Sequence, residues 1–74
     1  MRQVIAARIP KYYDVIMYEC QPIDIIHDEY VYEFGRWYVT CGGEGEYFNS
    51  NREACAYFVK MHLFAANEAL TNEM

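Results

Sequence analysis

Five side chains in this sequence belong to types that perform nucleophilic or metal chemistry, namely Cys20, His27, Cys41, Cys55 and His62. A cysteine nucleophile needs a neighbouring base that a third group orients. A zinc site needs four ligands, which sequences usually supply in close pairs such as CxxC or HxxxH. Neither spacing occurs here. We therefore expect no catalytic residue, no metal and no cofactor, and a protein that is not an enzyme.

Four of these five residues have ordinary structural explanations. Cys41 and Cys55 are expected to be small buried hydrophobic side chains. His62 lies near the centre of the apolar side of a predicted helix, which favours a core or interface histidine over a ligand or a base. His27 stands beside Asp28, which favours a surface ion pair. An odd number of cysteines without disulfide spacing favours a reducing compartment.

The segment Gly42-Gly-Glu-Gly45 has the glycines of a phosphate-binding loop but not its lysine. Glu44 and Glu46 would also repel a phosphate. We predict a flexible turn here. A small-molecule sensor that uses this turn and Trp37 is a third functional alternative to the two described below.

The element expected to position these groups is the stretch 29–41, which we predict to be a β-hairpin closed by Gly35-Arg36. Glycine at the first loop position suits a type II′ turn, which needs a positive φ there. The predicted register places apolar side chains on one face, namely Tyr30, Tyr32, Phe34, Trp37, Val39 and Cys41. The opposite face then carries Glu29, Glu33 and Tyr38.

Two strands are predicted before this hairpin. Residues 3–9 are β-branched in part and end at Pro10, which is typical of an edge strand. Residues 12–20 are apolar on both faces, with Ile16 and Tyr18 on one and Val15 and Met17 on the other. Such a strand is either central in its sheet or covered on both sides.

The strongest signal in the chain is a helix from Asn51 to about Leu70. Ser50 and Glu53 form a capping box at its start, and no proline or glycine interrupts it. At 100° per residue the apolar centre falls on Cys55, Phe58, His62, Ala65 and Ala69. We therefore predict one α+β domain over residues 1–74, with an antiparallel sheet of three to four strands and one long C-terminal helix packed on one face.

This helix is apolar over more than the stripe that one sheet covers. Surplus apolar surface on a small domain favours a partner. We expect a homodimer, or docking on another protein, through Tyr57, Leu63 and Phe64.

Charge is concentrated in the middle of the chain, whose total net charge is −5. Residues 12–51 carry eight acidic side chains against Arg36 alone, whereas residues 1–11 carry three basic side chains and no acid. The acidity argues against direct nucleic-acid binding and against an anionic membrane. It leaves three alternatives: a solvated sheet face, a surface that docks on a basic protein, or an acidic face neutralised by the basic N-terminal segment in a dimer. The residues of this candidate acidic face are Asp28, Glu29, Glu33, Tyr38, Glu44 and Glu46.

In size, acidity and compactness the whole chain resembles the small acidic proteins that phages and mobile elements encode to block host defence, including anti-CRISPR proteins. Those proteins share no common fold, so no residue roles are carried over. The resemblance implies an inhibitor or regulator that binds a larger protein, such as a nucleic-acid-handling enzyme. The alternative is a dimerising structural or assembly module without an inhibitory role.

No segment approaches 18 uninterrupted apolar residues, and the apolar run near residue 1 is too short for a signal peptide. We therefore expect a cytoplasmic protein.

Overall fold

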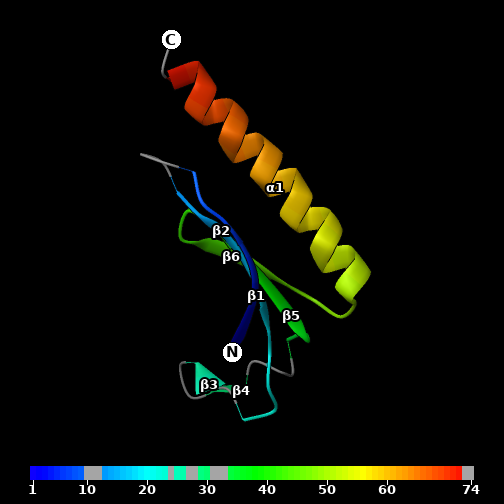
Figure 1. The fold of residues 1–74 in the computed structure, drawn as a ribbon. Helices are drawn as coiled ribbons and strands as arrows, with labels where there is room; N and C mark the ends of the chain where they lie inside the picture. Colours follow the sequence, from blue (N-terminus) through cyan, green and yellow to red (C-terminus); the bar gives the residue numbers. More distant parts are fainter. Residues whose placement is uncertain (10–12, 24, 27–28, 31–33, 73–74) are drawn as a thin grey trace.

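The protein has an α+β fold, described here from a computed structural model over residues 1–9, 13–23, 25–26, 29–30 and 34–72. In this part of the chain a four-stranded antiparallel sheet packs against one long helix, and a separate two-stranded sheet lies below it (Figure 1). The elements are β1 (Arg2–Ala7), β2 (Val15–Glu19), β3 (Ile25–Ile26), β4 (Glu29–Tyr30), β5 (Trp37–Cys41), β6 (Glu44–Phe48) and α1 (Asn51–Asn72). The predicted fold class is confirmed.

The strand order of the main sheet is β1-β2-β5-β6. As predicted, β1 lies at an edge and β2 is central. Side chains alternate along β2, so that Val15 and Met17 are buried beneath the helix while Ile16 and Tyr18 point to the other face. This explains why β2 is apolar on both sides.

The predicted hairpin between residues 29–34 and 37–41 is wrong. Strand β4 pairs with β3, with Ile26 opposite Glu29. Strand β5 pairs with β2 on one side and with β6 on the other, so both of its edges are occupied. Val15 and Glu44 lie opposite Cys41, where the prediction had Tyr30. Residues 31–33 lie outside the described part of the chain.

A tight hairpin joins β5 and β6 through Gly42 and Gly43. Their φ angles are +61° and +88°, and two consecutive positive values are what a type I′ turn requires. Gly35 has no such conformation. It is buried, and a Cβ atom there would lie 2.9 Å from the backbone nitrogen and oxygen of Phe48. Gly35 therefore serves close packing and not a turn.

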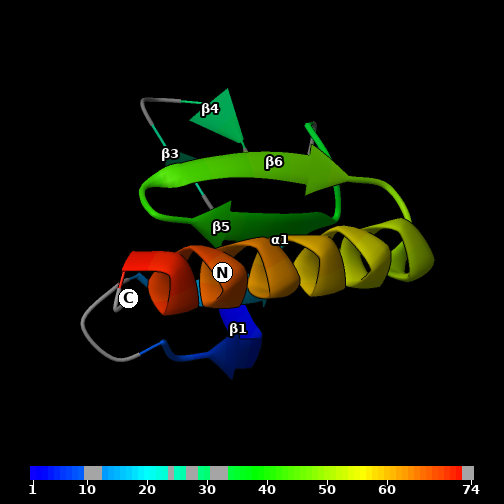
Figure 2. The same cartoon turned by 90° about the horizontal axis from the view of Figure 1, so that it is seen from above.

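Helix α1 begins where the capping box predicts. The backbone N–H of Glu53 donates to Ser50 Oγ at 3.1 Å. This bond satisfies one of the N–H groups that the first turn leaves without a helical partner. The helix then runs to Asn72 on one side of the sheet (Figure 2).

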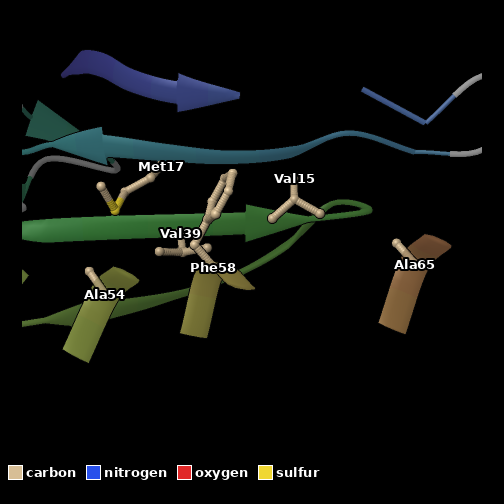
Figure 3. Close-up of a cluster of buried hydrophobic side chains, with 6 residues drawn as sticks. All are labelled: Val15, Met17, Val39, Ala54, Phe58 and Ala65. Atoms are coloured by element: carbon tan, nitrogen blue, oxygen red, sulfur yellow. The ribbon is translucent and has the colours of Figure 1, made fainter. Parts of the chain in front are cut away.

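The core lies between α1 and the sheet (Figure 3). Its buried members are Val15, Met17, Val39, Ala54, Phe58 and Ala65. Trp37 and Cys55 pack partly buried against this cluster. Of the predicted core, Val39, Phe58 and Ala65 are confirmed as buried.

Two predicted core residues are not in the core. His62 is exposed, and Phe34 is 52% exposed. His62 is exposed because the helix is rotated relative to the predicted orientation. The buried residues Ala54, Phe58 and Ala65 face the sheet, because two alanines allow the helix backbone to approach it closely. The predicted apolar centre lay further round the helix, toward His62.

Candidate protein-binding surfaces

Four aromatic rings form a continuous row on the face of the sheet opposite the helix. We call this row, made of Phe34, Tyr47, Tyr38 and Tyr18, the tyrosine ladder. The ring centroids lie 5.6 Å apart between Phe34 and Tyr47, 4.5 Å between Tyr47 and Tyr38, and 6.3 Å between Tyr38 and Tyr18. These separations are typical of favourable aromatic pairs.

Strand register explains the ladder. Tyr18 lies opposite Tyr38, and Tyr38 lies opposite Tyr47, so neighbouring strands β2, β5 and β6 each contribute one ring. Directly opposed side chains on one face of an antiparallel sheet are close enough to pack. The next residue along β5, Val39, is buried under α1. The ladder is therefore on the face that α1 leaves uncovered.

Packing within the ladder changes the acidity of one of its members. Burial raises the pKa of Tyr47, and the neighbouring Tyr38 and Cys20 add to the rise. The Tyr47 hydroxyl therefore keeps its proton to a higher pH than an exposed tyrosine does, and in this form it can donate as well as accept a hydrogen bond.

The predicted acidic face is divided between the two sides of the sheet. Glu44 and Glu46 lie opposite Cys41 and Val39, on the helix side, while Tyr38 belongs to the other side. Both glutamates are exposed on the outermost strand of the main sheet.

The remaining members of that predicted face lie elsewhere. Glu29 belongs to β4 in the two-stranded sheet, and Asp28 and Glu33 lie outside the described residues.

Basic residues near the start of the chain pair with acids of the same chain. The Arg2 guanidinium lies 3.1 Å from the Glu19 carboxylate, and that of Arg8 lies 3.8 Å from the Asp14 carboxylate. Both arginines remain more than two-thirds exposed, so these ion pairs add little to stability. Part of the basic segment is thus engaged within its own chain, which weakens the alternative that it neutralises a partner copy.

The side of α1 that faces away from the sheet carries a second apolar feature. Val59, Leu63 and Leu70 are 55%, 66% and 64% exposed. Together with Ala56 and Ala66 they recur at intervals of three and four residues, which places all five on one side of the helix. We call these five residues the outer stripe.

The predicted helix interface of Tyr57, Leu63 and Phe64 is not one face. Tyr57 is half-buried, and its ring packs on Phe48 with centroids 5.1 Å apart. Phe64 is 52% exposed but lies seven residues from Tyr57, on the same side of the helix. Leu63 alone belongs to the outer stripe. The three-and-four spacing in the sequence is the signal that identifies the rest of the stripe.

Cys41, Cys55 and His62 each interact with a neighbouring side chain in the structure. Burial has the largest effect on the Cys41 thiol and raises its pKa. A hydrogen bond with Tyr13 lowers the pKa by less, and the charge of Glu44 raises it by less still. A nucleophilic cysteine needs the opposite shift. The Cys55 thiol donates to Asn51 Oδ1 at 3.5 Å, and the His62 ring meets Phe58 edge-on at 6.5 Å.

Within the described residues, no group of three or more His, Cys, Asp or Glu side chains is placed to hold a metal ion. His27 lies outside these residues.

A pocket of about 400 Å³ lies at the start of β5, lined by Glu19, Cys20, Gln21, Pro22, Arg36, Trp37 and Asn49. The turn at Gly42 and Gly43 follows the other end of the same strand. Trp37 and Cys41 are the first and last residues of β5, so about 13 Å of extended chain separates the two features. The small-molecule sensor hypothesis joined them in one site, and the structure keeps them apart.

Across the described residues, no helix has the length and apolarity needed to cross a membrane. No protein-family model matches this sequence, and neither a curated protein nor a solved structure matches it.

Proposed function

We propose that this chain is a non-enzymatic binding protein that inhibits or regulates a larger protein by docking the tyrosine ladder on it. The observation that carries the proposal is the row of packed rings from Phe34 to Tyr18, in which the three tyrosines are half-buried, on the face of the sheet that α1 does not cover. Aromatic residues, tyrosine among them, are enriched at protein interfaces. Phe34, which is 52% exposed, would be the first ring that a partner meets.

Pre-organisation supports binding at this face. A tyrosine side chain offers a large apolar surface and a hydroxyl at a low entropic cost. In the ladder each ring is already held by its neighbour, with Tyr38 and Tyr47 only 4.5 Å apart. Fewer rotamers would then be lost on association, which leaves more of the contact energy for affinity.

Charge favours a partner with a basic surface. The chain has a net charge of −5. Glu44 and Glu46 are exposed on the edge strand β6, which also carries Tyr47, although their side chains lie on the helix side of the sheet and so at the border of the ladder face. Opposite charge around an interface speeds encounter and selects the partner. A nucleic-acid-handling enzyme has such a surface, and an anti-defence inhibitor encoded by a phage would be one form of this function in the cytoplasm.

Capture from a bacterial lysate tests the proposal with three variants of the tagged chain. We expect wild type to retain a basic, nucleic-acid-binding protein that moderate salt releases. Phe34→Ala with Tyr47→Ala should abolish capture, and Glu44→Lys with Glu46→Lys should weaken it. Val59→Ser, on the outer stripe, should capture as wild type does. Circular dichroism checks that each variant is folded.

The opposite pattern would overturn docking through the ladder. If Val59→Ser loses capture and the ladder variant keeps it, the helix is the docking surface.

A second candidate function is a dimerising structural or assembly module. The exposed outer stripe favours it, because an apolar row of this kind on a small domain is typically covered by a partner. We propose that the chain forms a homodimer in either case. Self-association without capture of any other protein would favour the assembly module over the inhibitor.

A further inference from the structure

The outer stripe has the spacing of a coiled-coil seam. Ala56, Val59, Leu63, Ala66 and Leu70 follow one another at intervals of three, four, three and four residues, which is the a/d pattern that pairs one helix with another. The opposite side of the same helix packs on the sheet through Ala54, Phe58 and Ala65. Helix α1 therefore has two apolar sides, and the sheet covers one of them.

We propose that the occupant of the outer stripe is a second copy of this chain, with the two α1 helices antiparallel. The inference rests on the proposed homodimer and adds its interface and orientation.

The charge of α1 allows two copies of this acidic chain to associate through the outer stripe. Within α1, Arg52 and Lys60 balance Glu53 and Glu68, so the helix has no net charge although the chain carries −5. The exposed glutamates of β6 lie on the sheet and not on the stripe. The stripe is thus a surface where self-association encounters little of the repulsion between the two chains.

The sizes of the stripe residues favour the antiparallel orientation. With the two-fold axis midway between Leu63 and Ala66, Leu63 meets Ala66 of the second copy and Val59 meets Leu70. These layers combine leucine with alanine and valine with leucine, which fills the middle of the seam evenly, while Ala56 lies at its end and meets no other stripe residue. A parallel pair would put Ala66 against its own copy within the seam and leave a gap there. Antiparallel helix dipoles are also favourable.

The residues that border the stripe are also compatible with the antiparallel orientation. Lys60 and Asn67 lie on the same side of the stripe, seven residues apart. In the antiparallel pair Lys60 of each copy lies beside Asn67 of the other, so like charges are not opposed.

The length of the stripe sets the expected affinity. From Ala56 to Leu70 it extends about 21 Å along the helix, at 1.5 Å per residue, and is about 10 Å wide. This contact is much smaller than the roughly 800 Å² that each partner buries in a standard interface. The dimer should therefore be weak, with a dissociation constant in the micromolar range.

Sedimentation equilibrium over a wide concentration range tests the interface. Wild type should dimerise, and Leu63→Glu should weaken dimerisation roughly 100-fold or more, because it replaces an apolar side chain by a charge in both copies. Phe64→Glu is the matched control, since Phe64 is also about half exposed and lies beside Leu63 but off the stripe. It should dimerise as wild type does.

Disulfide mapping tests the orientation. A Val59→Cys chain is mixed with a Leu70→Cys chain, both carrying Cys55→Ala, and oxidised mildly. Trypsin separates residue 59 (peptide 53–60) from residue 70 (peptide 61–74). The antiparallel pair should give mainly the mixed 59–70 disulfide.

Each other outcome overturns a stated part of the proposal. Mainly 59–59 and 70–70 disulfides would overturn the antiparallel orientation. A dimer that persists in Leu63→Glu would overturn the interface while keeping the homodimer, and a monomer at all concentrations would overturn both. A monomer whose capture of another protein is lost in Leu63→Glu would assign the stripe to that protein. Docking through the ladder is measured separately, by the Phe34 and Tyr47 substitutions.

Discussion

The ring of Tyr38 lies over Gly45 on the neighbouring strand. A Cβ atom at position 45 would overlap the hydroxyl oxygen, Cζ and Cε1 of Tyr38. Gly45 pairs with Thr40, two residues along β5 from Tyr38, so the ring reaches across diagonally on one face. A glycine weakens a strand because it has no side chain to pack, and an aromatic ring over it compensates. The glycine in turn leaves space for the ring.

Gly45→Ala should therefore destabilise the protein by about 1–3 kcal/mol, as overpacking does. The cause is the displaced Tyr38 ring, so the substitution should cost much less in a Tyr38→Ala background. Urea unfolding of the two single variants and the double variant measures this coupling. An equal cost in both backgrounds would show that the ring is not the obstacle.

Phe58→Ala and His62→Ala test which side of α1 faces the sheet. Phe58 is 8% exposed at the centre of the core, so its truncation should lower the free energy of unfolding by about 3–5 kcal/mol. His62 is exposed, and its truncation should change stability by no more than about 0.5 kcal/mol. Trp37 packs partly buried against the core, so the loss of stability in Trp37→Ala should lie between those of the other two variants. Comparable losses of stability in Phe58→Ala and His62→Ala would show that His62 belongs to the core.

The elements that sequence reasoning predicts best are those that local signals define. The helix from Asn51 is defined by its cap, by its uninterrupted length and by the absence of glycine and proline. The central position of β2 follows from apolar residues on both of its faces. Each of these signals lies within the element that it describes.

Strand pairing could not be predicted in the same way, because it joins residues that are distant in the sequence. Two glycine sites were available for a hairpin turn. Gly35-Arg36 had aromatic residues on both sides, while Gly42 and Gly43 supplied two positive φ angles. The second site joins β5 to β6, and its two positive φ angles are those of a type I′ turn.

The candidate surfaces depended on that pairing. The predicted hairpin places Tyr38 on one face with Glu33, whereas the row that Tyr38 forms with Tyr18 and Tyr47 depends on the observed register of three strands. The sequence does predict surplus apolar surface on α1. The orientation of that surface relative to the sheet cannot be predicted from it, because the rotation of the helix depends on how Ala54 and Ala65 pack against the sheet.

Gly43 provides a test of the turn that is free of packing effects. Its φ is +88°, and a Cβ atom there would meet no atom within 4 Å. Gly43→Ala should lower the free energy of unfolding by about 1–2 kcal/mol, through backbone strain alone. Gly43→Asn should cost less, because asparagine tolerates a positive φ. If urea unfolding shows that Gly43→Ala is as stable as Gly43→Asn or more stable, the type I′ turn is contradicted.

Alkaline pH should destabilise the fold through the half-buried hydroxyl groups of two tyrosines and one half-buried thiol. Burial raises the pKa of Tyr47 and of Tyr57 above the ordinary value of 10.0, and Glu46 adds to the rise at Tyr57. Burial likewise raises the pKa of Cys41 from 9.0. In each case the folded chain holds the proton more tightly than the unfolded chain does.

Because the folded pKa values are the higher ones, the stabilisation is complete below the unfolded values and is lost as pH rises through the folded values. The loss should begin near pH 9 with Cys41 and continue above pH 10 with the two tyrosines. Urea midpoints measured in reducing buffer at about pH 8 and about pH 10.5 give its size, since the tyrosines begin to ionise between these values. The double variant Tyr47→Phe, Tyr57→Phe removes two of the three groups. Its urea midpoint should therefore fall less between the two pH values than the midpoint of wild type does. An equal or larger loss in the variant would show that neither hydroxyl is held protonated by the fold.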